Sequence, residues 1–206
     1  MTPRFSHSAV AAWCVVAALA LMPASGASHA ADLSDLTNLT MGQLMQGLAK
    51  TRSGHAAFTE KKFIAMLDKP VESSGELFYR APDRLEKRTI KPRPESMILD
   101  GDSIVIERGR QKHTLQLQDY PELAAVIDSI RGTLAGDRKA LERSYRLVLV
   151  GGVEQWVLQL LPVDEKMQAL IKRIRITGVR YDLRSIEINR ADGDSSLMVI
   201  EKLTAR

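Results

Sequence analysis

Short apolar runs alternate with polar breaks between residues 57 and 101, which is the pattern of an antiparallel sheet. The runs cover residues 57–67, 76–79, 85–90 and 95–99. Asp100-Gly101 follows the last run and precedes another apolar run, and this predicts a tight hairpin because primed turns need φ > 0. We therefore predict an antiparallel meander over this part of the chain.

The rest of the chain adds more strands and a few helices. Apolar residues at helical spacing predict helices over residues 40–51, 121–134 and 137–144, with a helical turn over 167–171. Thr40 and Asp137 are the expected N-caps. Alternating runs predict further strands over residues 104–106, 114–117, 145–150, 155–161, 174–177, 179–188 and 197–203. The pattern amounts to about ten strands and three or four helices, an α+β class.

Five short motifs of the meander also resemble a known family. They are Phe58-Thr59, Ser74-Gly75-Glu76-Leu77, Arg80-Ala81-Pro82, Glu95 and Asp100-Gly101. Their order and spacing are similar to those of the periplasmic lipoprotein carriers of the LolA family, and the similarity continues almost to the C-terminus. The resemblance implies a mainly β fold with helices, a half-open antiparallel β-barrel of ten to eleven strands whose mouth the helices cover.

The resemblance also implies a function. A member of this family is expected to be a monomeric periplasmic carrier that shields the acyl chains of a lipoprotein or another lipid between the inner and outer membranes. Its expected partners are an inner-membrane donor and an outer-membrane acceptor protein, and no cofactor is expected. Two alternatives remain open: a periplasmic lipid-sensing regulatory protein of the same fold, and an enzyme that modifies a lipid in the cavity.

One face of the predicted sheet is apolar and would line such a cavity. The expected lining residues are Phe58, Leu77, Tyr79, Leu85, Leu99, Ile106, Leu115, Trp156, Leu158 and Leu160. In the central helix, Leu123, Ile127 and Ile130 are expected to form the lid. A closed and filled core would need the same alternation, so the pattern alone does not separate a cavity from a core.

The sequence departs from the family beside Pro82. Family carriers have an arginine directly before this proline, which holds the lid closed, whereas this chain has Ala81 there and Arg80 one place earlier. Successive side chains of a strand point to opposite faces. We therefore expect Arg80 to point away from the cavity and the lid to rest on apolar contacts.

Charge narrows the range of partners. The net charge is +4, and aromatic residues make up 5% of the chain. Nucleic acid is not an expected partner, because the chain is predicted to be exported and has few aromatic side chains on which bases could stack. Basic residues cluster at Lys61-Lys62 and within residues 84–93, 108–112 and 172–175. These clusters fit either solvated strand faces or a surface that meets anionic lipid or an acidic partner.

No group of residues predicts catalysis or metal binding. His55 and His113 are the histidines beyond residue 30, where there is no cysteine, so a zinc site is not expected. The aspartates near residues 100 and 192 fit hairpin turns better than a calcium loop. Glu60 and Glu76 could approach across neighbouring strands, but the lysines and arginines around them favour ion pairs over acid–base work.

The first 30 residues read as a cleaved secretory signal peptide. Arg4 precedes the uncharged apolar run of residues 9–22, which is shorter than the roughly 20 residues that cross a bilayer. Ser28-His29-Ala30 offers small residues for signal peptidase. Cys14 lies inside the apolar run and is not expected to carry a lipid. Residues 31–206 are then expected to form a single domain.

The signal peptide yields a first prediction. When the full chain is produced in a Gram-negative host, the protein recovered from the periplasm should begin at Ala31, because Ala30 ends the cleavage site. N-terminal sequencing of that fraction checks this. An intact Met1 in the membrane fraction would contradict it.

Overall fold

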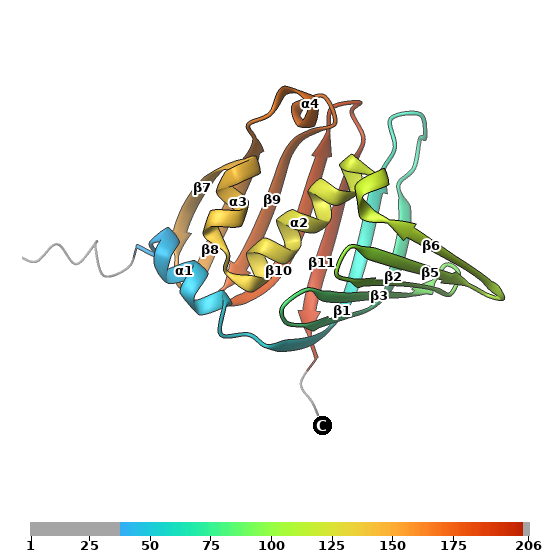
Figure 1. Ribbon diagram of the computed structural model, residues 1–206, viewed down its shortest axis with the longest axis horizontal. Coiled ribbons are helices and arrows are strands. Elements are labelled where there is room, and N and C mark those ends of the chain that lie inside the picture. Colours follow the sequence, from blue (N-terminus) through green and yellow to red (C-terminus); the bar gives the residue numbers. More distant parts are fainter. Residues whose placement is uncertain (1–37, 204–206) are drawn as a thin grey trace, which may run out of the picture. The chain divides into compact units, whose positions relative to one another are not determined.

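Eleven strands form one antiparallel sheet in the computed structural model, which describes residues 38–203. The spatial order is β6-β5-β4-β3-β2-β1-β11-β10-β9-β8-β7. Because β1 pairs with β11, the first meander continues directly into the second, and β6 and β7 form the two edges (Figure 1). The sheet is not closed, which confirms the predicted fold class. The predicted signal peptide lies outside the described residues.

The bounds of the elements follow the chain. The strands are β1 (Ser53–Phe63), β2 (Val71–Arg80), β3 (Arg84–Lys91), β4 (Glu95–Asp100), β5 (Ser103–Arg108), β6 (Gln111–Gln116), β7 (Tyr145–Gly152), β8 (Gln155–Pro162), β9 (Ile171–Val179), β10 (Asp182–Arg190) and β11 (Ser195–Lys202). The helices are α1 (Met41–Leu48), the 3-10 turn η1 (Leu117–Asp119), α2 (Pro121–Ala135), α3 (Arg138–Ser144) and α4 (Glu165–Gln168). No helix within residues 38–203 is both long and apolar enough to cross a bilayer.

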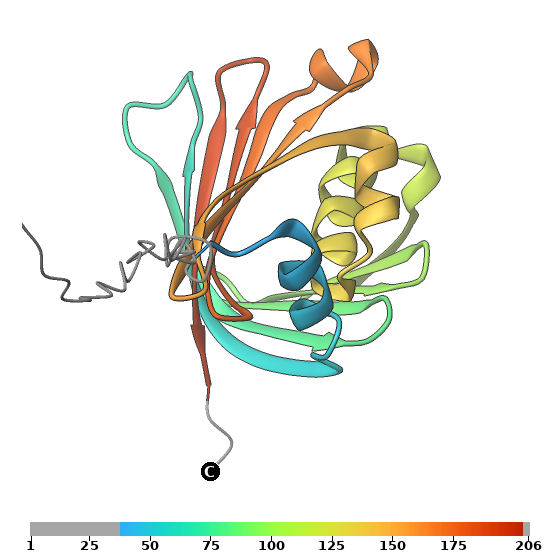
Figure 2. The same ribbon diagram turned by 90° about the vertical axis from the view of Figure 1, so that its left-hand side faces the viewer.

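Helices α1, α2 and α3 lie on the concave side of the sheet (Figure 2). The predicted caps are present: the Thr40 hydroxyl accepts from the Gln43 amide, and Asp137 accepts from the Ala140 amide. Helix α2 has Pro121 in its first turn and ends at Gly136, which takes the left-handed conformation with φ of 64°. The two central helices agree with the prediction, whereas α1 is shorter than predicted.

The strands β7, β8 and β9 pack against α1 and α3 in a filled core. Trp156, Leu158 and Leu160 are fully buried there. The Trp156 indole N–H donates a hydrogen bond of 2.7 Å to the carbonyl oxygen of Arg180. Gly178 lies against the indole ring, since a Cβ at this position would stand 2.1 Å from a ring carbon. The core under this half of the sheet therefore leaves no room for another molecule at Trp156.

Two predicted boundaries are wrong for identifiable reasons. The break expected near Gly178 is not a turn: β9 continues through Gly178, and the hairpin turns at Arg180, whose φ is 55°. Glycine is required there because the indole ring and the backbone oxygen of Asp182 leave no room for a Cβ, and not because the chain turns. The first strand begins earlier and ends earlier than predicted, so Met66 and Leu67 belong to the β1–β2 loop.

The placement of Trp156 yields a stability prediction. Trp156→Ala should lower the free energy of unfolding by about 3–5 kcal/mol, because it removes a fully buried indole and leaves a cavity. Urea unfolding followed by circular dichroism measures this. Val150→Ala is the matched control, since Val150 is 57% exposed and should change stability by no more than about 0.5 kcal/mol. Equal effects of the two changes would contradict the filled core.

Candidate binding cavity

A cavity of about 970 Å³ lies between α2 and the middle of the sheet. Both ends of β10 line it, from Asp182 to Arg190, so it extends over about 27 Å at the usual rise of a strand. The hydrocarbon core of a bilayer, about 30 Å thick, holds two opposed acyl chains. The cavity is therefore longer than one extended acyl chain, and its volume is typical of sites for small molecules.

The wall of the cavity is mainly apolar and comes from six strands and from the helices α1 and α2. Its apolar members include Leu48, Ala56, Phe63, Ile64, Leu77, Phe78, Tyr79, Leu85, Met97, Leu99, Leu123, Val126, Ile127, Ile130, Leu134, Leu170, Leu183, Ile186, Ile188, Met198 and Ile200. Most of the β-strand members follow the alternation of the sheet, and the α2 members form one side of that helix. Exposed residues such as Tyr120 and Tyr181 also line the cavity, so it opens to solvent.

Seven of the residues expected at the cavity line it together. They are Leu77, Tyr79, Leu85 and Leu99 from the sheet, and Leu123, Ile127 and Ile130 from α2. The register explains the first group, because Tyr79 pairs with Leu85 and Leu85 pairs with Leu99 across three neighbouring strands. Three side chains on one face of adjacent strands form a continuous apolar patch.

The other expected lining residues lie elsewhere. Trp156, Leu158 and Leu160 belong to the filled core under α1 and α3. Ile106 and Leu115 do not line the cavity but pack against the cluster of Leu99, Ile104, Leu117 and Ile127, of which Leu99 and Ile127 also reach the cavity wall. Phe58 is buried within the wall, with the Lys87 ammonium 4.9 Å from the centre of its ring. Alternation alone could not separate these places, because filled and hollow parts of one sheet share the same period.

Strands β10 and β11 contribute lining residues that sequence reasoning missed. Ile186, Ile188, Met198 and Ile200 face the cavity from the second meander. In β10 the signal was the alternation of Ile186 and Ile188 with polar residues, whereas residues 197–200 of β11 form an unbroken apolar run that does not show which side chains face inward. What the sequence did not provide was the pairing of β1 with β11, which brings Phe58 opposite Ile200 and joins the two halves.

A buried carboxylate interrupts the apolar wall. The Glu60 side chain is 7% exposed, and it forms an ion pair with Lys87. The Lys62 ammonium lies 3.8 Å from the other carboxylate oxygen, and the Ser73 hydroxyl donates a bond of 3.3 Å to Glu60. A buried charge is tolerated only when paired and hydrogen-bonded, which these contacts provide. Glu76 lies on the opposite face of the sheet, pairing with Ala57, so the two glutamates do not form a catalytic pair.

Polar contacts tie α2 to the sheet at three places. The Tyr145 hydroxyl of β7 donates to the carbonyl oxygen of Ala125 at 2.9 Å. Arg131 donates to the carbonyl oxygen of Gly101 in the β4–β5 turn at 2.8 Å, and Glu122 forms an ion pair with Arg190 at the end of β10. The expectation that the lid rests on apolar contacts alone is therefore wrong. Arg80 is exposed, as its position in the strand predicted.

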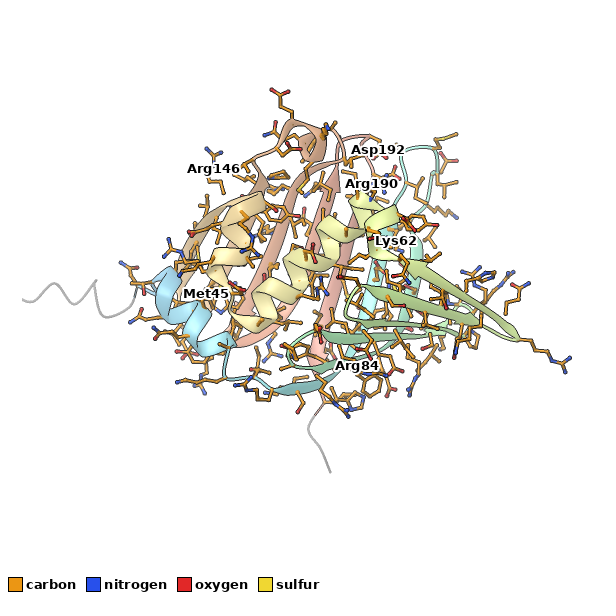
Figure 3. All side chains as sticks on the ribbon, in the orientation of Figure 1. Met45, Lys62, Arg84, Arg146, Arg190 and Asp192 are labelled. Carbon is orange, nitrogen blue, oxygen red and sulfur yellow. The ribbon has the colours of Figure 1, made fainter. Side chains whose placement is uncertain are left out.

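Several ionisable groups near α2 have shifted pKa values. Burial raises the pKa of the Tyr145 hydroxyl, with Asp128 adding to the shift, so the group stays neutral and remains a donor. Burial also raises the pKa of Tyr79, whose enclosed hydroxyl has no partner among the described residues. The backbone N–H of Asp194 chiefly lowers the pKa of Asp192, so Asp192 remains charged beside Arg190 (Figure 3).

Within residues 38–203, no three or more histidine, cysteine, aspartate or glutamate side chains gather as a metal site would require. The cavity therefore presents mainly apolar surface, with several ion pairs, among them Glu60–Lys87, Glu122–Arg190 and Asp182–Lys202, and the unpartnered hydroxyl of Tyr79. Such a wall fits a hydrophobic molecule held by contact area, not by coordination or by a net charge.

Comparison with protein families identifies the family of the chain. The model described as "Outer membrane lipoprotein carrier protein LolA-like" matches residues 34–202. No curated protein sequence matches the chain significantly.

Solved structures with a similar arrangement are remote in sequence. A LolA superfamily protein from Nitrosomonas europaea is 11% identical, with 82% of this chain and 96% of that chain covered and a TM-score of 0.44. The MucA/MucB complex of Pseudomonas aeruginosa contains a chain that is 15% identical, with 81% and 58% covered and a TM-score of 0.46. The lipoprotein LppX of Mycobacterium tuberculosis is 9% identical, with 78% and 93% covered and a TM-score of 0.43.

The apolar wall yields a binding prediction. The protein should bind the hydrophobic dye bis-ANS, and Leu77→Asp should weaken binding about tenfold or more, because a bound apolar molecule would bury an unpaired carboxylate. Fluorescence titration measures the affinity. The control is Leu197→Asp, since Leu197 lies on β11, which β1 separates from the strand of Leu77, and it is exposed and does not line the cavity. If the two changes weaken binding equally, the cavity is not the dye site.

The ties of α2 yield a prediction about release. Glu122→Gln should accelerate dissociation of bound dye about twofold to fivefold, since a partly exposed ion pair is worth up to about 1 kcal/mol. Stopped-flow displacement measures the rate. Arg80→Leu is the control, because it removes a charge that faces away from the cavity. A rate increase with Arg80→Leu and none with Glu122→Gln would mean that the ion pair does not hold the lid.

Proposed function

Because the chain belongs to the family of LolA-like outer membrane lipoprotein carrier proteins, we propose that it is a periplasmic carrier for the acyl chains of a lipoprotein or another lipid. It would take this cargo from an inner-membrane donor protein and deliver it to an outer-membrane acceptor. The proposed activity is binding and release, without a chemical step or a cofactor. A monomer suffices, since one chain supplies the whole cavity.

The observation that carries the proposal is the long apolar cavity under α2. Burial of hydrocarbon is worth roughly 0.8 kcal/mol for each CH₂ group, so an acyl chain in the cavity gains affinity from contact area alone. Such contacts do not depend on direction, so chains of different length and saturation can occupy the same wall. Met97 and Met198 add flexible side chains that adapt to the shape of the bound molecule.

Release of the cargo depends on α2, which covers the cavity. The helix contributes Leu123, Val126, Ile127, Ile130 and Leu134 to the wall, so its displacement removes one entire side. Its ion pairs to the sheet, Arg131 with Asp102 and Glu122 with Arg190, are partly exposed, and such pairs contribute about 0–1 kcal/mol each. The Arg131 hydrogen bond to the Gly101 carbonyl oxygen adds about 0.5–1.5 kcal/mol. A contact with an acceptor can therefore break them at low cost, while the buried Tyr145 bond still holds Ala125, which lies between them in the first half of the helix.

The experiment that tests the function identifies the cargo. The protein is purified from the periplasm of a Gram-negative host without detergent, and organic extracts are analysed by mass spectrometry. We expect acylated molecules at close to one per protein in the wild type, and a marked loss in Leu77→Asp but not in Leu197→Asp. Extracts free of acyl chains, from a protein that binds bis-ANS, would contradict an acyl carrier. A covalently altered lipid would instead favour a lipid-modifying enzyme.

A further inference from the structure

The β1–β2 loop exposes apolar side chains at one end of the sheet. Met66 is 93% exposed and Leu67 is 52% exposed, and Phe63 and Val71 at the adjoining strand ends are about half exposed. Isolated apolar residues are common on surfaces, but four within nine consecutive positions of one loop form a patch. Such patches are typical of surfaces that contact a membrane or a partner.

The loop is held in position by hydrogen bonds. The Ala65 amide donates to a carboxylate oxygen of Asp194 in the β10–β11 connection at 2.9 Å, and the Leu67 amide donates to the Ile64 carbonyl at 2.8 Å. At the base of the loop, Phe63 pairs with Ser195 of β11. The backbone is therefore fixed while Met66 points to solvent, so the exposure is built into the loop.

The loop borders the opening of the cavity. Lys62, Phe63 and Ile64 line the cavity, as do Tyr120 at the start of α2 and Asp194. The loop projects beyond the sheet at the same end as the β10–β11 connection (Figures 1 and 2). A surface in contact with Met66 would therefore lie next to the cavity opening, and an acyl chain could pass between them with little exposure to water.

Basic residues surround the apolar patch. Lys61 and Lys62 precede it, Lys69 lies within it, and Lys91 of β3 pairs with Ser74 of β2 close to it. Within residues 38–203, Lys69, Lys91 and Arg93 form no ion pair, whereas Lys61 is paired with Glu72. Asp68, which forms no ion pair among the described residues either, and Glu72 offset part of this charge, but the unpaired cations Lys69, Lys91 and Arg93 outnumber Asp68. Lysine and arginine beside an apolar patch match an anionic phospholipid surface.

We propose that the β1–β2 loop is a membrane-docking element, in which Met66 and Leu67 enter the headgroup region of an anionic phospholipid bilayer and the surrounding lysines hold them there. The proposal builds on the carrier function, since it places the cavity opening at the bilayer. Binding by a few apolar side chains and exposed cations is reversible and weakens as salt screens the charges. A carrier that must leave the membrane again needs such a contact.

Vesicle co-sedimentation tests the proposal. Wild-type protein should bind vesicles of phosphatidylcholine with phosphatidylglycerol, bind pure phosphatidylcholine weakly, and lose binding as salt is raised. Met66→Ser with Leu67→Ser should lower the partition coefficient about tenfold, because most of the inserted apolar area is removed. Val148→Ser with Val150→Ser is the matched control, since both valines are exposed on β7 and do not line the cavity.

Fluorescence locates the contact. A Met66→Trp variant should shift its emission to shorter wavelength with anionic vesicles, whereas Val150→Trp should not; Trp156 is fully buried and contributes a constant background. Absence of vesicle binding by the wild type, or equal binding by the loop and control variants, would overturn the proposal. The proposal would also be overturned if the variant Met66→Ser with Leu67→Ser bound vesicles like the wild type but no longer delivered cargo to a membrane protein. That result would assign the loop to a protein partner.

Bis-ANS titration of the same samples separates this proposal from the carrier function. The loop variants should bind the dye as the wild type does, because neither Met66 nor Leu67 lines the cavity. A protein that binds dye but not vesicles contradicts the docking element alone. A protein that binds vesicles but neither dye nor acyl chains contradicts the carrier.

Discussion

The covering of the concave apolar face by α2 is the interaction on which the rest of the structure depends. An open antiparallel sheet of eleven strands has too much apolar surface to leave in water, and the chain covers it with three helices. Over β7, β8 and β9 the helices α1 and α3 fill the space completely. Over the middle of the sheet, α2 is tied by Tyr145 on one side and by Arg131 and Glu122 on the other, and the space beneath it stays open. The same helix thus completes the core and forms the roof of the cavity.

The polar contacts around the cavity differ in strength, and this difference suits a carrier. The Glu60–Lys87 pair is enclosed in the wall, where separation of the partners would leave a buried charge and cost several kcal/mol. It therefore stabilises the wall in every state. The ion pairs that tie α2 to the sheet, Arg131 with Asp102 and Glu122 with Arg190, are partly exposed, so they contribute less and water can replace them. The wall is fixed more firmly than the roof, so in the proposed carrier uptake and release would require movement of one helix only.

The sequence predicted the fold class, the two central helices and most strands, because alternation, helical spacing and caps are local properties. It also placed Leu77, Tyr79 and Leu85 on one face. It could not tell Trp156 from Leu77, since both occupy inward positions and only the packing of α1 and α3 decides which part is filled. The Arg190–Glu122 and Arg131–Gly101 ties join residues far apart in the chain and follow from the three-dimensional arrangement. The strand boundary predicted at Gly178 is wrong, because the close approach of the Trp156 ring, and not a turn, requires glycine at this position.

The central claim is that acyl chains occupy the space between α2 and the sheet. Photo-crosslinking with a fatty acid that carries a diazirine near its methyl end, followed by peptide mass spectrometry, tests it most directly. The account predicts crosslinks to α2 and to the facing strands, at residues such as Ile130, Ile186 and Met198, with Leu197 and Val199 on the outer face unlabelled. Crosslinks confined to the outer face, or spread evenly over both faces of β11, would contradict it.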